Sequence, residues 1–220
     1  NTDPDAILTW LTYAWFAVAM GVFIALFFVA APYGRHARSG WGPMISSRTG
    51  WFLMESPSPL VFGACFLLGE APVTTTSLAF VAMWWGHYVY RAWIYPFRLN
   101  SAVKPMPLSV VAMAILFNCA NGYLNGRYLF GPAGGYPAAW LATPQFWVGA
   151  LLFVSGLMIN RRADHTLWLL REPGQSEYRI PQGGLYRWVS CPNYLGEIVQ
   201  WFGWAIATWS LAGLSFAVWT

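Results

Sequence analysis

The residues best suited to chemistry lie in one stretch of the chain, from Met158 to Gln200. In an otherwise apolar sequence, this stretch contains five arginines, four acidic residues, two asparagines and the pair Gly183-Gly184. Arginine side chains bind phosphate and other anions, and paired glycines let the backbone come close to a ligand. The stretch therefore predicts a nucleotide cofactor site at a membrane surface, formed by about residues 158–200.

Helical spacing groups some of these residues. Asp164 follows Asn160 by one turn and Arg171 follows Asp164 by two, so a helix would place all three on one face. Asn193 and Glu197 are likewise one turn apart. The candidates for binding phosphate are Arg171, Arg179 and Lys104. The sequence has no G-x-G-x-x-G and no P-loop motif, so the cofactor must be held between transmembrane helices rather than by a Rossmann domain.

The composition is that of a membrane protein. Of the 220 residues, 57% are hydrophobic and only 9% are charged, against about 25% charged residues in ordinary soluble domains. So few charges cannot cover the surface of a soluble core of this size. The net charge of +4 does not indicate a nucleic-acid partner, because the basic residues are separated to one side of the membrane by the predicted topology. We predict an all-α, polytopic membrane helical bundle that forms a single domain over residues 1–220.

Apolar runs predict about seven transmembrane helices, the last of them cut off by the chain end. The runs comprise residues 6–31, 56–69 (extended backwards from 51), 74–97, 107–130, 146–160 (with a continuation to 170 left open), 194–209 and 211–220. The first run exceeds a signal-peptide core, so we interpret it as a true span. Eleven of the twelve Lys and Arg residues then lie on or near one side, and only Arg127 lies opposite. The positive-inside rule makes the basic side cytoplasmic and puts the N-terminus outside.

The three cysteines, Cys65, Cys119 and Cys191, show neither paired spacing nor a metal-binding motif. Cys65 and Cys119 lie within apolar runs, where a cysteine packs as a small hydrophobic residue. We therefore expect no metal site, and the cysteines indicate no particular redox compartment.

Polar side chains at membrane depth are costly and usually functional. Glu55 is one of them, and an interfacial position beside a loop is the alternative interpretation. The segment H-Y-x-Y-R at residues 87–91 is a second, although taken alone it fits an aromatic belt with a snorkelling arginine better. Asn118, Asn121 and Asn125 share a helix face. They suit interhelical hydrogen bonds and the lining of a pocket equally well.

The order of short motifs along the chain resembles that of the steroid 5α-reductase family. The most specific motifs are S-E-Y-R-I-P-Q-G-G-L-Y at residues 176–186 and N-x-L-G-E at 193–197. The weaker ones are Y-G-R-H at 33–36, W-F-L-x-E-x-P-S at 51–58, H-Y-x-x-R at 87–91, N-G at 121–122 and A-x-A-T-W-S at 205–210. The resemblance covers nearly the whole chain. The short loops of this sequence favour a bacterial homologue.

This resemblance implies a seven-helix membrane oxidoreductase that uses NADPH to reduce the Δ4 double bond of a 3-oxo steroid, by hydride transfer to C5. Glu55 and Tyr88 would hold the 3-keto oxygen. The residues implied to contact the cofactor are Asn160, Asp164, Arg171, Tyr178, Arg179, Asn193 and Glu197, to which we add Lys104. Those assigned to the substrate pocket are Trp51, Arg91 and Asn121. Family members continue into a complete seventh helix and a basic, aromatic tail that touches the cofactor, whereas this sequence stops at Thr220.

The residue types suit that reaction. Hydride delivered to the β-carbon of an enone pushes negative charge onto the ketone oxygen, and hydrogen-bond donors placed there in a dry pocket stabilise it. Tyr88 is such a donor, and Glu55 is one when protonated, a form that burial favours. Apolar walls between helices suit a lipophilic substrate that enters sideways from the bilayer.

Other functions remain open at this point. One is a membrane methyltransferase that uses S-adenosylmethionine, because such enzymes carry an H-P-x-Y-x-G motif where this chain has C-P-N-Y-L-G at residues 191–196. Another is a receptor or transporter without enzymatic activity. A third is the same reductase chemistry on a polyprenol or an enoyl thioester. We expect a monomer in the bacterial inner membrane, or in the endoplasmic reticulum if the source is eukaryotic.

Overall fold

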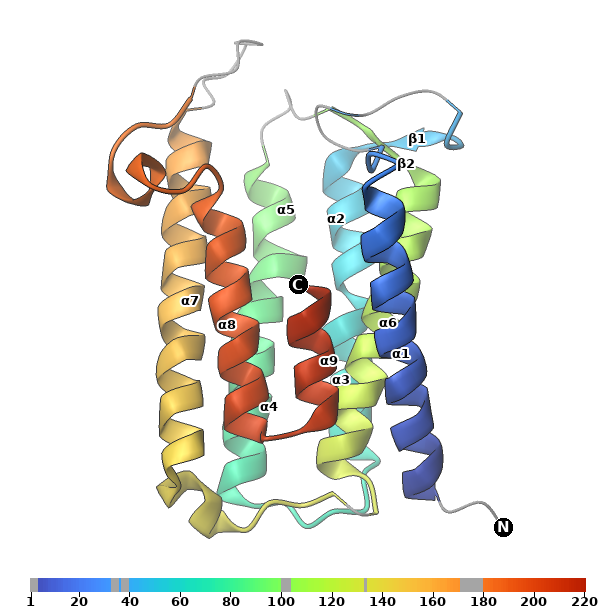
Figure 1. Cartoon of the computed structure of the whole chain (residues 1–220), viewed down its shortest axis with the longest axis vertical. Coiled ribbons are helices and arrows are strands. Elements are labelled where there is room, and N and C mark those ends of the chain that lie inside the picture. Colours follow the sequence, from blue (N-terminus) through green and yellow to red (C-terminus); the bar gives the residue numbers. More distant parts are fainter. Residues whose placement is uncertain (1–3, 33–35, 37–39, 100–103, 133, 171–179) are drawn as a thin grey trace.

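The computed structural model describes residues 4–32, 36, 40–99, 104–132, 134–170 and 180–220, and shows long helices aligned along one axis (Figure 1). The α-helices are α1 (Pro4–Leu26), α2 (Ser47–Glu55), α3 (Pro57–Leu67), α4 (Thr75–Tyr88), α5 (Tyr95–Arg98), α6 (Leu108–Phe130), α7 (Pro144–Leu169), α8 (Pro192–Thr208) and α9 (Leu211–Trp219). A π-helix, η2 (Val89–Ile94), joins α4 to α5. The short 3₁₀ helices are η3 (Ala138–Ala142) and η4 (Gly184–Arg187).

The helical class expected from the sequence is confirmed, with one small addition. Strands β1 (Met44–Ile45) and β2 (Met106–Pro107) form a two-residue antiparallel ladder in which Met44 lies opposite Pro107. This ladder ties the chain before α2 to the chain before α6, at the end of the bundle away from the N-terminus (Figure 1). It was not predicted, because two residues leave no periodic signal in the sequence.

Local sequence sets where the helices begin. The Thr74 hydroxyl accepts a hydrogen bond from the Ser77 backbone N–H at 3.2 Å, and the Ser77 hydroxyl accepts from the Thr74 N–H at 2.8 Å, which caps α4 from both sides. Thr143 caps α7 in front of Pro144, and proline suits the first turn because it has no N–H to satisfy. Proline occupies the same position in α8, at Pro192.

Two of the predicted spans are interrupted helices. The second run divides at Ser56, because α2 ends at Glu55 and α3 begins with Pro57, which lacks a backbone donor. In the third run, α4 ends at Tyr88 and the chain continues as the π-helix η2. Such π-helical turns are rare and frequently lie at functional sites. The two interruptions directly follow Glu55 and Tyr88, the residues expected to bind the substrate ketone.

Glycines allow α7 and α8 to pack in backbone contact. A β-carbon at Gly156 of α7 would collide with the backbone of Gln200, and one at Gly196 of α8 would collide with the backbone of Asn160. Small residues at helix interfaces permit this close approach in membrane proteins. The two helices consequently present their polar residues to each other at short range.

An aromatic core fills the half of the bundle nearer the N-terminus. Phe62 stacks on Trp84 with 4.5 Å between ring centroids, and Trp84 contacts Trp204 at 5.1 Å. Trp201 packs on Phe216 of α9 at 4.0 Å. Aromatic pairs of this kind add stabilisation beyond the area they bury. The core holds α3, α4, α8 and α9 in a fixed relation below the polar site.

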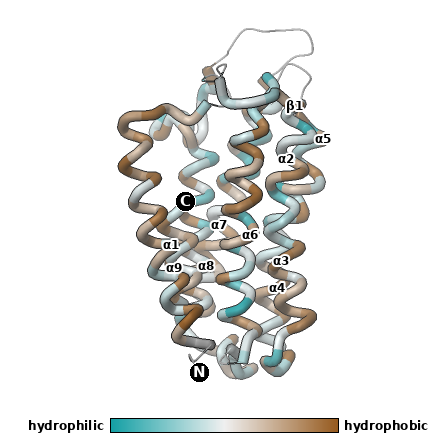
Figure 2. Tube along the Cα trace, turned by 90° about the vertical axis from the view of Figure 1, so that its right-hand side faces the viewer, coloured by the Kyte–Doolittle hydropathy of each residue, from teal (hydrophilic) through white to brown (hydrophobic). Residues whose placement is uncertain are grey.

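Large apolar side chains on α1 and directly after its end face outwards. Trp10 is 71% exposed, Phe27 73% and Phe28 82%, and hydrophobic colour runs along α1 in Figure 2. Residues Ala6–Leu26 and Leu108–Phe130 are the helices long and apolar enough to cross a membrane in the part of the chain that the structure describes. Each of the seven apolar runs is helical, although α1 ends at Leu26 rather than at residue 31. That all seven cross a membrane stays a prediction.

Candidate active site

Arg91 lies at the centre of the polar site and reaches three carboxylates. Its Nε is 3.7 Å from Glu55 Oε1, its Nη1 is 3.6 Å from Asp164 Oδ2 and its Nη2 is 3.3 Å from Glu197 Oε1. The acids come from α2, α7 and α8, and the arginine comes from η2. The Arg91 side chain is only 14% exposed. One guanidinium therefore joins four separate elements, which its planar set of five N–H donors permits.

Aromatic rings hold the Arg91 guanidinium in place. Its Cζ lies 4.4 Å from the ring centroid of Trp51 and 5.1 Å from that of Tyr95. Cation–π contacts of this kind stabilise a partly desolvated cation. Trp51 and Arg91, both assigned to the substrate pocket from the sequence, are thus in direct contact.

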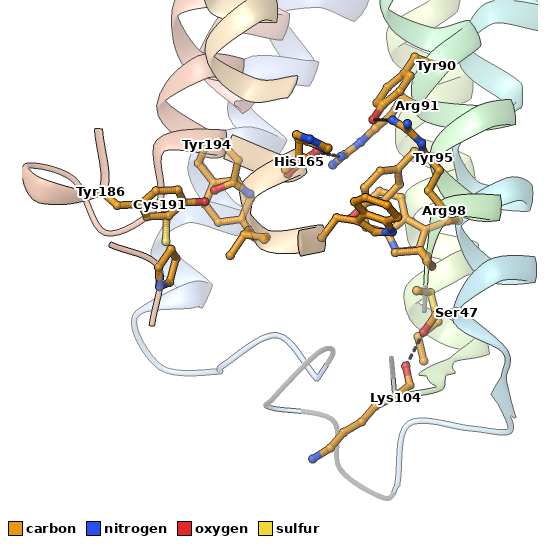
Figure 3. Close-up of a pocket in the computed structure, with 18 of the residues that line it drawn as sticks. Ser47, Tyr90, Arg91, Tyr95, Arg98, Lys104, His165, Tyr186, Cys191 and Tyr194 are labelled. Carbon is orange, nitrogen blue, oxygen red and sulfur yellow. Dashed lines mark hydrogen bonds and ion pairs between the residues drawn. The ribbon is translucent and has the colours of Figure 1, made fainter. Parts of the chain in front are cut away.

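A cavity of about 320 Å³ opens beside this cluster. Five of the residues selected from the sequence line it: Trp51, Arg91, Lys104, Asp164 and Asn193. Tyr90, Arg91, Tyr95 and Arg98 form one side, whereas Tyr186, Cys191 and Tyr194 lie across from them, with His165 between (Figure 3). The volume is at the lower end of the range of small-molecule sites, about 300–1,000 Å³.

The pair Asn160 and Asp164 on α7 faces the pair Asn193 and Glu197 on α8. Asn160 Nδ2 donates to the Asn193 carbonyl at 3.1 Å and to Glu197 Oε1 at 3.2 Å. Asn160 is 3% exposed and Asp164 8%. The structure therefore brings Asn160, Asp164, Asn193 and Glu197 together, and Glu197 connects this group to Arg91.

Asn118 connects the two helix interruptions. The Tyr88 hydroxyl donates to Asn118 Oδ1 at 3.5 Å, and Asn118 Nδ2 donates to the Met54 carbonyl at 2.7 Å. Met54 directly precedes Glu55, so α6 links the end of α4 to the end of α2. Tyr88 is 3% exposed. From the sequence, an interhelical hydrogen bond and the lining of a pocket were equally open for Asn118, because only the tertiary structure shows what it contacts.

The chain is similar in sequence to known proteins. The family model described as 3-oxo-5-alpha-steroid 4-dehydrogenase matches residues 104–220. A steroid 5-alpha-reductase DET2 from Gossypium hirsutum is 41% identical over 208 residues, which cover 93% of this chain and 81% of that protein. The 3-oxo-5-alpha-steroid 4-dehydrogenase 1 of Bos taurus is 39% identical (97% and 84% covered), and that of Homo sapiens is 38% identical (98% and 83%).

The chain belongs to the 3-oxo-5-alpha-steroid 4-dehydrogenase family. It is therefore an oxidoreductase that acts on CH–CH groups. The resemblance read from the short motifs is confirmed. The family match begins at Lys104 and contains α6 to α9, whereas Glu55, Tyr88 and Arg91 precede it and lie in the part shared with the full-length relatives.

Four of the residues expected to bind the cofactor in this dehydrogenase-family chain are not seen to do so. Arg171, Tyr178 and Arg179 lie outside the described residues. The Lys104 carbonyl accepts a hydrogen bond from the Ser47 hydroxyl, while its ammonium points away from the other labelled residues (Figure 3).

Asn121 is fully buried, and its Oδ1 accepts from Asn125 Nδ2 at 3.1 Å. Trp204 Nε1 in turn donates to Asn125 Oδ1 at 2.8 Å, which connects α6 to α8. Asn121 does not line the cavity beside Arg91. Its assignment to the substrate pocket stays a prediction, and the contacts of Asn125 are those of an interhelical hydrogen bond.

A buried pair beside Tyr88 was not predicted from the sequence. His87 Nδ1 lies 3.0 Å from Gln200 Nε2 and 3.2 Å from Gln200 Oε1, and the exposed fractions are 5% for His87 and 0% for Gln200. Gln200, a polar residue at the start of the apolar run Trp201–Thr208, was the available signal. The pair ties the end of α4 to α8 next to the site.

Proposed function

We propose that this chain uses NADPH to reduce the Δ4 double bond of a 3-oxo steroid, with hydride transfer to C5 and the 3-keto oxygen held by Glu55 and Tyr88. One observation carries the proposal. Arg91 joins Glu55, on the proposed substrate side, to Asp164 and Glu197, on the proposed cofactor side, within one cluster. A reductase needs its cofactor and substrate sites to adjoin, because hydride transfer requires the reacting atoms in contact.

The cavity offers the groups that a dinucleotide needs. Arg98 is a cation for phosphate groups, and Asp164 and Asn193 supply a carboxylate and an amide for hydroxyl and carboxamide groups. These residues fit NADPH, which supplies the hydride when bound. The surrounding chain orients the cofactor and excludes water. Residues 158–200 would then form the cofactor region of a single domain spanning residues 1–220.

Tyr88 and Glu55 act on the charge that develops at the ketone oxygen. The Tyr88 hydroxyl makes a long hydrogen bond, 3.5 Å, to Asn118, so little is lost when it turns to a substrate oxygen. Burial strengthens such a bond because little water competes with it. Arg91 holds one carboxylate oxygen of Glu55, which leaves the other oxygen for the substrate when the group is protonated.

The distribution of charge supports a membrane topology of seven spans with the N-terminus outside. Arg48, Arg98 and Lys104 lie at the end of the bundle opposite the N-terminus, whereas Arg127 pairs with Glu70 at 3.5 Å near the other end. By the positive-inside rule the cavity beside Arg91 then faces the cytoplasm. We place the protein as a monomer in a bacterial inner membrane, or in the endoplasmic reticulum of a eukaryote.

A substrate panel tests this function. Purified protein in detergent is supplied with NADPH and, separately, with a 3-oxo-Δ4 steroid, a polyprenol and an enoyl-CoA, and products are identified by mass spectrometry. We expect a 5α-reduced steroid and no comparable turnover of the other two. We also expect a KM for NADPH about tenfold below that for NADH, because charged hydrogen bonds to the 2′-phosphate contribute about 1.5–3 kcal/mol. Turnover of only the polyprenol or the thioester, or methyl transfer from S-adenosylmethionine, would reassign the substrate or the reaction.

A further inference from the structure

A second cavity, of about 490 Å³, lies on the side of α7 away from Asp164. Met158, Ile159 and Arg162 of α7 form its floor, and residues 182–186 form its wall. Successive helical residues are about 100° apart around the axis, so Arg162 and Asp164 point to nearly opposite sides of α7. We call this second cavity the outer groove. It contains Gly183 and Gly184, which were expected from the sequence at the nucleotide site.

The outer groove is apolar at one end and cationic at the other. Met158 and Ile159 belong to the apolar run of α7, and Met158 is 47% exposed. Arg162 follows one turn later, is exposed, and has no ion pair with any described residue. Met158 and Arg162 are separated by about 6 Å along the helix axis. A ligand that satisfies both ends must combine an anion with a hydrocarbon chain.

The wall of the groove belongs to residues 180–188, a stretch with the character of a membrane-interface segment. Ile180 is 71% exposed, Leu185 42% and Trp188 81%, and tryptophan is enriched where bilayer meets water. The segment bends over α7 because Gly183 and Gly184 adopt φ angles of +84° and +52°, which residues with a side chain rarely adopt. The Tyr186 hydroxyl fastens it to α7 by donating to the Ala163 carbonyl at 3.1 Å.

We propose that the outer groove binds one glycerophospholipid with an anionic headgroup. Its phosphate contacts Arg162, and one acyl chain lies over Met158 and Ile159 beneath Leu185. Free phosphate would leave the apolar end uncovered, and in a zwitterionic lipid the headgroup ammonium would offset the attraction between the phosphate and Arg162. The site rests on the membrane position proposed for α7, which places Arg162 at the headgroup level.

Lipid titration of the delipidated full-length chain tests this site. Native mass spectrometry counts bound phosphatidylglycerol and phosphatidylcholine on the wild type, on Arg162→Gln and on the matched control Arg48→Gln, which removes an exposed arginine from the same end of the bundle. We expect the first phosphatidylglycerol to bind the wild type about fivefold more tightly than phosphatidylcholine, the contribution of one arginine near anionic lipid. Arg162→Gln should lose this preference and Arg48→Gln should keep it.

A second variant tests the apolar end independently. Ile159→Trp fills the groove and should weaken both lipids, whereas Val154→Trp, on the exposed face of α7 outside the groove, should weaken neither. NADPH binding and thermal unfolding show that each variant is folded, and they separate this site from the proposed reductase function. Equal binding of the two lipids by the wild type, retention of the preference by Arg162→Gln, or displacement of the lipid by glycerol 3-phosphate would each overturn the proposal.

Discussion

At the scale of single residues, the site depends on how one cation is shared. Three acids, each from a different helix, approach Arg91 within 3.7 Å. Buried carboxylates without a partner are strongly unfavourable. Arg91 therefore both permits the acids to converge and sets their relative positions, which a lysine with its single ammonium group reproduces only in part.

Replacing Arg91 tests this dependence. Arg91→Gln should lower the free energy of unfolding by about 3–5 kcal/mol, because it leaves the three acids without their shared cation. Arg91→Lys should fall between this variant and the wild type. Unfolding in detergent, followed by intrinsic tryptophan fluorescence, gives the comparison. Arg48→Gln, on the exposed side of α2, should change little, and an Arg91→Gln variant as stable as that control would contradict the role assigned to Arg91.

Tyr88 and Glu55 should affect the chemical step rather than cofactor binding. Tyr88→Phe removes one donor at nearly constant volume and should slow steroid reduction by about 10²–10³-fold, the usual loss for such a donor. Glu55→Gln keeps an amide donor and should lose less than Glu55→Ala. Single-turnover hydride transfer and equilibrium NADPH binding are measured separately on each variant.

A matched control for Tyr88→Phe is Tyr123→Phe, because Tyr123 is 44% exposed on α6. The control should reduce steroid at the wild-type rate. If Tyr88→Phe also does so, or if Glu55→Gln abolishes NADPH binding, the assignment of these residues to the substrate ketone is wrong.

At the scale of elements, interrupted helices and close helix packing create the site. α2 ends at Glu55 and α4 ends at Tyr88, so both residues lie where the regular α-helical repeat is interrupted. The contact of Gly156 and Gly196 with the facing backbone brings α7 and α8 together. The Asn160–Glu197 hydrogen bond depends on that distance.

Substitution of Gly196 should separate α7 from α8. The β-carbon of Gly196→Ala would collide with the backbone of Asn160, so the helices must move apart at a cost of about 1–3 kcal/mol. We expect lower thermal stability and a higher KM for NADPH. Gly86→Ala is the matched control, because Gly86 is also helical and has open space at the β-carbon position. Wild-type stability and KM in Gly196→Ala would show that the packing tolerates separation.

At the scale of the whole molecule, the bundle has one basic end and one end with little charge. Reporter fusions test how it sits in the membrane. A reporter inserted after Gly40 should be cytoplasmic, whereas one inserted near Gly134, at the other end of the bundle, should lie on the far side. Protease protection or a compartment-specific fluorescent reporter gives the readout. The reverse pattern would place the cavity beside Arg91 on the side without cytoplasmic nucleotides.

Much of the architecture could be predicted from the sequence because its causes are local. Long apolar runs bounded by proline, threonine and glycine specify helices without reference to the rest of the chain. The spacing of four residues between Asn160 and Asp164, and between Asn193 and Glu197, likewise places each pair on one helix face. These predictions needed only the repeat of the α-helix.

Only the tertiary structure decided which faces meet. The contacts of Arg91 with Glu55, Asp164 and Glu197 join positions far apart in sequence, and no spacing rule predicts contacts between different helices. The same holds for His87 with Gln200. Gly183 and Gly184 lie on the outer side of α7 rather than beside Asp164, because the path of a loop depends on the surface it packs against and not on its own residues alone.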